Sequence, residues 1–470
     1  MGGTVSCFDL LFRGGTLVTT EAVGSSDLAI VDGRIVATGP GLEGEAKEIV
    51  DATGMHLFPG FIDAHVHFNE PGRQHWEGLV SGPRSLAAGG GTCFFEMPLN
   101  AHPPTLDRGE FERKRACAEA KSILDFALWG GLTPINLNSL DGLADAGVIG
   151  FKAFMSRSGT SDFPHSDAKV LKRGMTTAAS RGLPVAVHAE DDALTHSLAE
   201  QSRSQGRTGW QDYISSRPIE AELRAINVVL DLAGELDCDV HIVHVSSPEG
   251  IDLIRAARVA GIRVTAETCP HFLLLTDEDV GRLGAVAKCA PALRDRTHLE
   301  EMWERIKAGA IDTLGSDHSP APPELKVSED FFKVWGGIAG CQHAFPLALA
   351  EWLLRFGIKE FPRFSAMTAA NVAERFGLGR TKGRIAAGFD ADITMIDLRE
   401  SLTITAKELL YRHRISAYVG TVLRAVVKGT WVRGHAVYRN GDFPDSIRGK
   451  LLTPNQTTYA KPAGGSVARI

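Results

Sequence analysis

The sequence lacks the features that mark disulfide scaffolds, thiolate zinc sites and membrane proteins. Its 470 residues include only 7 Cys, an odd number, scattered and never spaced as CxxC. This argues against a disulfide framework and against a thiolate zinc site. No apolar run reaches the roughly 18 residues that a membrane-spanning helix needs, and the N-terminus lacks the layout of a signal peptide. We therefore predict a cytoplasmic protein with reduced, buried cysteines.

Neither sign of charge dominates the chain. The 50 Lys and Arg against 57 Asp and Glu give a formal charge of -7, which is mild for this length and predicts neither nucleic acid nor a membrane as partner. The MGGTVS start and the Ala468-Arg469-Ile470 end loosely resemble a myristoylation signal and a peroxisomal address. Such short matches arise often by chance, so the cytoplasm stays the prediction and the peroxisome the alternative.

Both ends of the chain are rich in strand patterns. Residues 9–60 and 383–441 contain β-branched stretches punctuated by Gly and Asp-Gly, with turns expected at Lys428-Gly429 and Asn440-Gly441. Two such ends around a different middle predict a small β-sandwich domain made from residues 1–57 and 383–445. The Gly- and Pro-containing residues 446–470 are expected to form a C-terminal extension.

The middle of the chain, residues 58–382, alternates between short apolar runs and segments with helical spacing. This alternation predicts an α/β fold, a (β/α)8 TIM barrel. The alternative is an open doubly wound sheet, which would need a Gly-rich phosphate loop after an early strand, and none is evident. The eight expected strands are 58–67, 91–97, 125–131, 148–154, 184–190, 239–246, 262–268 and 311–318.

Six polar residues fall near the ends of these expected strands, where the catalytic groups of barrels lie. Alternate residues of a strand point to the same face, so His65 and His67 aim at one point. Taken singly, each has a structural explanation: a hydrogen-bonded core His, a Lys with a packed stem, or an Asp that caps a helix. Six together are hard to explain as coincidences. They are His65, His67, Lys152, His188, His244 and Asp317.

Imidazoles and carboxylates are good ligands for zinc, and cobalt, manganese and iron also fit such a set. Lysine becomes a ligand only when CO2 converts its amine to an anionic carbamate. We therefore interpret the set as a site for two divalent cations, in which water would become a nucleophile at neutral pH. One ion would take His65, His67 and Asp317, the other would take His188 and His244, and a carbamate on Lys152 would bridge them.

Six blocks of the sequence resemble the amidohydrolase superfamily: PGFIDAHVHFNEPG, GFKAFMS, VAVHAE, IVHVSSPEG, ETCPHFL and GSDHSP. The most similar branch is the cyclic amidohydrolases, which comprises allantoinases, dihydroorotases and hydantoinases (dihydropyrimidinases). The resemblance spans residues from about 8 to about 440. It implies a barrel with a small β-sandwich, a carbamylated Lys152, a binuclear metal centre and a homodimer or homotetramer.

Within this branch, HFNEPGRQHWEG and FEMPLN most resemble the allantoinases. The resemblance implies hydrolysis of the hydantoin-ring amide of allantoin to allantoate. Dihydroorotases typically have Arg two residues past the HxH pair, where this chain has Asn69. Hydantoinase, dihydropyrimidinase or dihydroorotase activity remains an alternative, and so does a non-catalytic scaffold that has lost metal ligands.

The resemblance also implies residue roles. Asp317 would be the catalytic base and then acid, and Asn100 and Ser319 would contact the substrate, although turn and cap chemistry explains these two equally well. The family's Ser-Pro-Pro segment, which holds the ring through its backbone, is replaced here by Cys289-Ala290-Pro291. His271 is structural by the family pattern, so we leave it out of the metal set.

Overall fold

A ring of parallel strands forms the centre of the molecule. The computed structural model describes residues 7–444 and 447–454. Each strand pairs in parallel with the next along the chain. The strands are β6 (Phe61–Val66), β7 (Gly91–Glu96), β8 (Asp125–Leu128) with β9 (Gly130–Gly131), β10 (Phe151–Phe154), β11 (Val185–His188), β12 (Val240–Ile242), β13 (Val264–Thr268) and β14 (Thr313–Leu314).

The ring is closed by contacts between its first and last strands. Val66, at the end of β6, forms a parallel bridge with His318, and the His67 N–H donates to the His318 carbonyl at 2.8 Å. An open sheet would leave these two edges apart, so the doubly wound alternative is excluded. The predicted barrel is confirmed, and each of its strands lies within the segment predicted for it.

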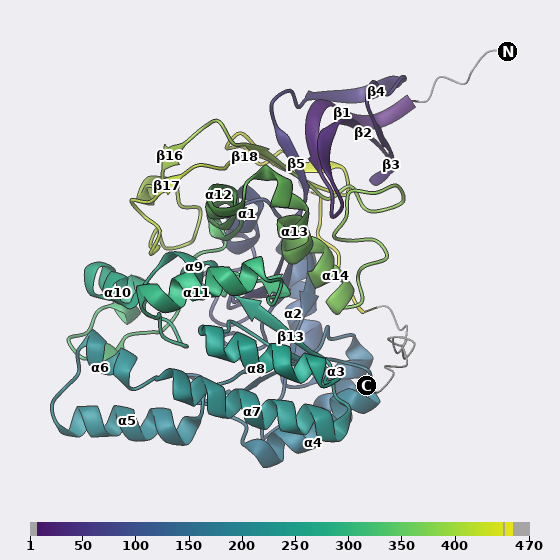
Figure 1. Ribbon diagram of the computed structural model, residues 1–470. Coiled ribbons are helices and arrows are strands. Elements are labelled where there is room, and N and C mark those ends of the chain that lie inside the picture. The colour runs from purple at the N-terminus through teal and green to yellow at the C-terminus, as the bar shows by residue number, and fades with distance from the viewer. Residues whose placement is uncertain (1–6, 445–446, 455–470) are drawn as a thin grey trace, which may run out of the picture.

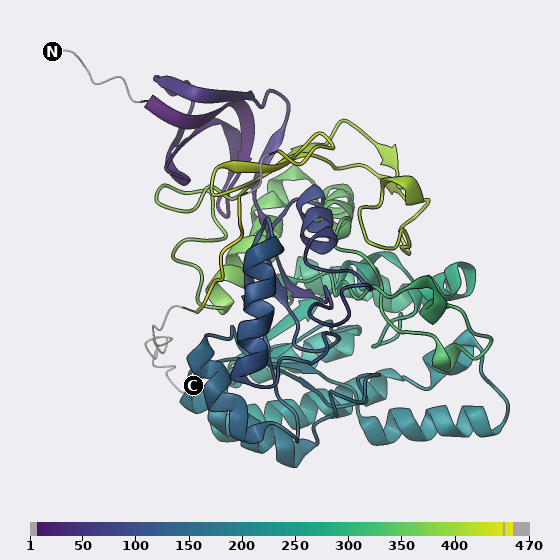
Figure 2. The same ribbon diagram turned by 180° about the vertical axis from the view of Figure 1, so that it is seen from behind.

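Helices follow the strands and cover the outside of the ring (Figures 1 and 2). They are α1 (Ser81–Ala88), α2 (Arg108–Lys121), α3 (Leu140–Ala146), α4 (Ala168–Ser180), α5 (Asp192–Ser204), α6 (Trp210–Ser215), α7 (Ile219–Leu236), α8 (Pro248–Val259), α9 (Pro270–Leu274), α10 (Asp277–Leu283), α11 (Arg296–Lys307), α12 (Ala344–Phe356), α13 (Phe361–Ser365) and α14 (Asn371–Arg375).

Side-chain caps define where several of these helices begin. Asp107, Asp167, Asp191 and Asp295 precede α2, α4, α5 and α11, and each carboxylate accepts from the backbone N–H three residues later. Ser247 caps α8 in the same way, with Pro248 at the first helical position. Such caps satisfy backbone donors that have no partner inside the helix. They fix the points at which the strand-end loops pass into helices.

Strands from both ends of the chain form a second, bent sheet at one end of the molecule (Figure 1). Phe12 packs edge-on against Trp431, with ring centroids 4.8 Å apart, so the two ends share one core. The sheet order is β19 (His435–Arg439), β18 (Val426–Val432), β15 (Ile393–Asp397), β5 (His56–Pro59), β1 (Cys7–Val18), β2 (Val23–Val31) and β3 (Arg34–Gly39), and β4 (Glu45–Asp51) also pairs with β1. The short strands β16 (Leu402–Thr403) and β17 (Val422–Leu423) pair separately.

The turn predicted at Lys428-Gly429 is wrong. Both residues lie inside β18, and the chain turns instead at Arg433-Gly434, where both residues have positive φ. Gly429 is a glycine for a packing reason, because a Cβ there would lie 2.4 Å from the Trp431 ring. The turn predicted at Asn440-Gly441 is confirmed by the positive φ of both residues.

The segment after the second sheet returns to the barrel. The Phe126 N–H of β8 donates to the Lys450 carbonyl at 3.0 Å, and the Leu452 N–H donates back to the Phe126 carbonyl at 2.7 Å. The terminal patterns at residues 1–6 and 468–470 lie outside the described residues.

Cysteine and membrane predictions can also be compared with the structure. All seven cysteines are free; five are buried, Cys117 is partly buried and Cys7 is exposed, so the prediction of buried cysteines is wrong for Cys7. Among residues 7–444 and 447–454, no helix has the length and apolar character that crossing a membrane would require.

Candidate metal centre

The six polar residues predicted from strand ends converge at one mouth of the barrel. Lys152 and His188 lie within β10 and β11, and His65 lies within β6. The other three follow the ends of β6, β12 and β14 by one to three residues. All are buried except Asp317, whose side chain keeps 13% of its surface exposed. The carboxyl ends of the strands therefore form one polar, largely enclosed rim.

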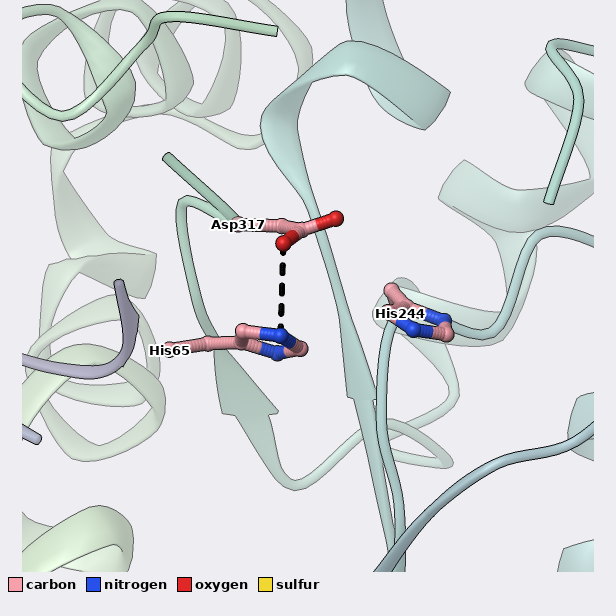
Figure 3. A group of neighbouring side chains, drawn as sticks. All are labelled: His65, His244 and Asp317. Atoms are coloured by element: carbon pink, nitrogen blue, oxygen red, sulfur yellow. Dashed lines mark ion pairs between the residues drawn. The ribbon is translucent and has the colours of Figure 1, made fainter. Parts of the chain in front are cut away.

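Asp317 lies close to the imidazoles of His65, in β6, and of His67, just after it. Its Oδ1 is 3.2 Å from His65 Nε2 and 3.4 Å from His67 Nε2. Ligand atoms of His65, His244 and Asp317 all lie within 4.8 Å of one another, and Figure 3 shows the carboxylate above the His65 ring with His244 beside them. This spacing brings possible metal-binding atoms together from the first, sixth and eighth strands of the barrel.

His188 and His244 form a second pair at the same rim. His188 Nδ1 lies 3.0 Å from His244 Nε2, and the two ring centroids are 4.7 Å apart. His244 Nδ1 is buried and has no hydrogen-bond partner among the described residues. Two imidazole nitrogens that face each other in a buried site are suited to hold a cation.

The backbone at this rim adopts left-handed conformations that residues other than glycine rarely adopt. Asn69, Asn100, His244 and Asp317 have φ values of 65°, 67°, 41° and 44°. Left-handed conformations of non-glycine residues cost about 1–3 kcal/mol each and persist only where the surrounding structure holds them. The fold thus stabilises strained positions where the candidate ligands and their neighbours lie.

Two carboxylates that we did not predict orient the imidazoles. Glu267, in β13, accepts from His65 Nδ1 at 2.7 Å, which leaves the lone pair of His65 on Nε2. Glu190 accepts from His188 Nε2 at 2.8 Å and also pairs with Arg217. The sequence carried a signal for both, because Glu190 lies two residues after His188 and Glu267 lies near the end of the seventh strand.

The two predicted substrate contacts have local partners. The Asn100 amide lies 3.2 Å from His67 Nδ1. The amide nitrogen Nδ2 faces the ring; with the amide flipped, its oxygen would accept from Nδ1–H and leave Nε2 of His67 free for a cation. The Ser319 N–H donates to the Ile338 carbonyl at 3.0 Å, which ties the residue after His318 to the loop that follows. Asn100 therefore contacts a candidate ligand directly.

Burial disfavours the charged form of three of the four imidazoles. It lowers the pKa of His67 to about 4 and lowers the pKa of His188 and His244 as well. Burial alone would raise the pKa of Asp317, but its interactions with His65 and His67 outweigh burial and hold that pKa well below its usual range. The site therefore offers neutral lone pairs and one carboxylate, which is the protonation state that metal binding requires.

Lys152 is the least satisfied group at the rim. It is fully buried, its Nζ has no hydrogen-bond partner among the described residues, and its nearest aromatic ring, Phe154, lies 4.7 Å away. Burial lowers the pKa of this amine to about 7. A buried, unpaired amine is costly unless it is neutral or chemically modified.

His271 and the Cys289-Ala290-Pro291 segment also lie beyond barrel strands. His271, at the start of α9, is buried, and neither ring nitrogen has a hydrogen-bond partner within the described part of the chain. The Ala290-Pro291 peptide bond is cis, and the Cys289 carbonyl accepts from the Tyr213 hydroxyl at 3.0 Å. A cavity of about 370 Å³ is lined in part by Ala290 and by Arg217, which pairs with Glu190; none of the six candidate ligands lines it.

Comparison with known proteins shows the family to which the chain belongs. Residues 56–437 match the profile of the Amidohydrolase family. The chain belongs to this family. This amidohydrolase is 49% identical to the allantoinase of Rubrobacter xylanophilus, over 96% of this chain and 99% of that protein. It is 48% identical to the allantoinase of Deinococcus radiodurans, over 95% of this chain and 99% of that protein.

A solved structure shares the whole fold of this amidohydrolase. The L-hydantoinase (dihydropyrimidinase) from Arthrobacter aurescens matches it with a TM-score of 0.92 and 30% sequence identity. The match covers 95% of this chain and 100% of that chain. The predicted resemblance to the cyclic amidohydrolases is therefore confirmed along nearly the full length.

Proposed function

We propose that this amidohydrolase hydrolyses the hydantoin-ring amide of allantoin to give allantoate, with the help of two divalent cations. The observation that carries the proposal is the convergence of four imidazoles, a buried amine and a carboxylate at one mouth of the barrel. The identity of nearly half of all aligned residues with two allantoinases, at 49% and 48%, supports the choice of substrate.

The residues present fit a pair of metal ions. His65, His67 and Asp317 would hold one ion, His188 and His244 the other, and Lys152 would bridge the two as a carbamate. The neutral amine of Lys152 would form a bond to the carbon of CO2 and release one proton, which gives an anion with two oxygens. Zinc best matches the ligand set, and cobalt, manganese or iron would also fit it.

The cations and the protein side chains would have separate roles in ring opening. When bound, the cations would polarise the ring carbonyl and lower the pKa of a water molecule. Asp317 is held as a carboxylate, so it would accept a proton from the attacking water and pass it to the departing ring nitrogen. Glu267 and Glu190 would keep the His65 and His188 rings in their metal-binding orientation.

Other cyclic amides are less well supported as substrates. The fold is shared with a hydantoinase, but that likeness comes with 30% identity, well below the identity to the allantoinases. Dihydroorotases typically have Arg at the position of Asn69. Here Asn69 is buried, with its N–H 3.1 Å from Glu96 and its side-chain amide 3.4 Å from the Pro320 carbonyl. An acidic substrate therefore has no cationic partner at this position.

A non-catalytic scaffold is also less well supported, because such a relative would have lost metal ligands and this chain keeps all six. Asn100 and Ser319 remain our candidates for substrate contacts. We further propose that the protein acts in the cytoplasm as a homodimer or homotetramer, with residues 1–57 and 383–445 forming the β-sandwich domain and residues 446–470 a C-terminal extension.

A substrate panel tests the proposed function. Protein loaded with zinc and bicarbonate is offered allantoin, dihydroorotate and dihydrouracil, and the metal content of the same sample is measured. We expect allantoin to be opened far faster than the other two. The reverse ranking would keep the fold and the metal site but overturn the choice of substrate.

A further inference from the structure

A buried histidine that is not one of the candidate ligands lies directly after Asp317. This residue, His318, has no exposed surface. Its Nδ1 accepts from the Gly340 N–H at 3.1 Å. A ring nitrogen that accepts a hydrogen bond carries no proton, so the proton of a neutral His318 ring lies on Nε2. The Nε2 atom has no hydrogen-bond partner among the described residues.

A carboxylate oxygen lies beside this nitrogen. Glu77, in the loop that follows β6, is fully buried, and its Oε2 lies 3.5 Å from His318 Nε2. This oxygen also lacks a hydrogen-bond partner within residues 7–444 and 447–454. A buried donor and a buried acceptor that each lack another partner offset the cost of each other's burial when they pair. We therefore treat Glu77 and His318 as one pair.

Three separate parts of the chain enclose this pair. The Oε1 atom of Glu77 accepts from the Arg412 N–H at 3.1 Å, and the Glu77 carbonyl accepts from Arg412 Nε at 2.9 Å. The ring centroids of Tyr411 and Phe68 lie 5.0 Å and 5.8 Å from that of His318. Because Tyr411 and Arg412 belong to the segment between β16 and β17, a distant part of the chain helps to fix the His318 ring.

The backbone of His318 in turn fixes Asp317. The His318 N–H donates to Ser316 Oγ at 3.1 Å, and its carbonyl accepts from the His67 N–H at 2.8 Å. Asp317 lies between Ser316 and His318 with a φ of 44°, a conformation that persists only where the surrounding structure holds it. A shift of His318 would therefore move the strained residue whose carboxylate lies 3.2 Å from His65 Nε2.

We propose that Glu77 and His318 are positioning residues that hold the Asp317 carboxylate for proton transfer. The inference rests on the proposed function and deepens it, because both residues would act through Asp317 and neither would touch the substrate. Since Asp317 would act as a base in the chemical step, moving it should lower kcat and leave the KM for allantoin nearly unchanged. The same movement should weaken zinc binding, because Asp317 is also a candidate ligand.

Glu77→Gln tests the pair in the zinc-loaded enzyme. The amide has a single oxygen, so it cannot accept from both His318 Nε2–H and the Arg412 N–H. We expect kcat to fall about tenfold, KM to change by less than about twofold, and chelator competition to show zinc binding weakened about tenfold. Glu119→Gln is the matched control, because Glu119 lies on the surface and pairs with Arg115, and it should change none of these quantities.

Two substitutions of His318 separate the pair from a structural role of the ring. Glutamine places its amide near the position of Nε2, whereas asparagine places an oxygen near the position of Nδ1. His318→Gln can therefore still donate to Glu77, and His318→Asn can only accept from the Gly340 N–H. We expect His318→Gln to keep kcat within about threefold of the wild type and His318→Asn to lose about tenfold.

Three results would overturn the proposal. The first is a kcat of His318→Asn that equals or exceeds that of His318→Gln, and the second is a Glu77→Gln enzyme with unchanged kcat and zinc affinity. The third is a rise in KM alone. Thermal unfolding shows whether the His318 variants fold; if they do not, Glu77→Gln decides. Failure of the proposed function is distinguishable, because the wild type would then not hydrolyse allantoin, whereas the zinc affinities would still test the pair.

Discussion

At the scale of single residues, the buried amine of Lys152 connects the structure to its chemistry. It has no hydrogen-bond partner among the described residues, and burial lowers its pKa to about 7, against a usual value of 10.5. A lysine on the surface would be protonated at neutral pH and could not add to CO2. Burial in the barrel therefore increases the fraction of this amine that is neutral at pH 7, which is the form that reacts with CO2.

The pH dependence of metal loading follows from this pKa. Only the neutral amine reacts with CO2, so in metal-free protein the rate of reconstitution by zinc and a fixed concentration of dissolved CO2 should rise about tenfold per pH unit below pH 7 and level off above it. The imidazole of His67, with its pKa near 4, stays neutral across this range. Stopped-flow recovery of activity between pH 5.5 and 8 measures the profile; a rate that is flat or falls with pH would contradict it.

Glu267 gives a second prediction at this scale. Its carboxylate fixes the His65 ring, and burial, which alone would raise its pKa, is outweighed by His65 and His241, which lower it to about 2. Glu267→Gln should weaken zinc binding by about 10–100-fold, as is typical when a group that orients a ligand is lost. Chelator competition measures the affinity. Glu235→Gln, on the surface, is the control, and equal affinities in both variants would remove this role from Glu267.

The residue scale also shows what the sequence could and could not predict about the site. The six candidate ligands could be chosen because each lies near a strand end, and strand ends of a barrel meet at one rim. Glu267 and Glu190 were missed because their roles depend on which imidazole each one faces across neighbouring strands. Strand position alone does not supply that information.

At the scale of elements, Gly429 shows how packing can override a turn pattern. The pair Lys428-Gly429 has the composition of a turn, yet Gly429 pairs with Met395 inside the sheet. The Trp431 ring occupies the space beside it, where a Cβ would lie 2.4 Å away. Sequence patterns report local turn preference, whereas this glycine is required by a side chain two residues further along.

Gly429→Ala should therefore destabilise the second sheet. The added methyl group must displace Trp431, and overpacking of this kind costs about 1–3 kcal/mol in the free energy of unfolding. Gly24→Ala in β2 is the matched control, because nothing lies within 4 Å of its Cβ position. Urea denaturation compares the two variants. Equal stability of both would show that Trp431 has room to move.

At the scale of the whole molecule, a buried ion cluster joins the barrel to the second sheet. Lys382 Nζ lies 2.6 Å from Asp125 of β8, 3.0 Å from Asp390 and 2.7 Å from Asp392, and its side chain is 1% exposed. Arg433, in the turn between β18 and β19, also pairs with Asp125. The Lys382 ammonium thus contacts three carboxylates contributed by both parts of the fold, and Asp390 also pairs with Arg34 at 3.2 Å.

Lys382→Met should destabilise the molecule strongly, because it removes the buried cation that these three carboxylates share. Loss of one partner from a buried ion pair costs about 3–5 kcal/mol. Lys47→Met removes an exposed pair with Asp9 and should leave stability within error. Thermal and urea unfolding provide the comparison, and a Lys382→Met protein as stable as Lys47→Met would show that the cluster does not hold the two parts together.

The architecture of the whole chain was the most predictable level. The alternation of apolar runs with helical spacing repeats along the middle of the chain, so the barrel follows from periodicity alone, and strand patterns at both ends indicated a shared sheet. The path of the loop that follows β14 was not predictable. Phe331–Gly337 has no period, and its shape depends on Lys288 and Lys326, whose contacts only the folded chain reveals.

The metal content of the wild type and of Lys152→Ala, measured together with allantoin hydrolysis, tests the central claim most directly. Both proteins are loaded with zinc and bicarbonate, freed of excess metal and weighed intact by native mass spectrometry. The account predicts two zinc ions and the added mass of one CO2 on each active wild-type chain, and an inactive Lys152→Ala protein that lacks this pair. A Lys152→Ala protein with two zinc ions and full activity would contradict it.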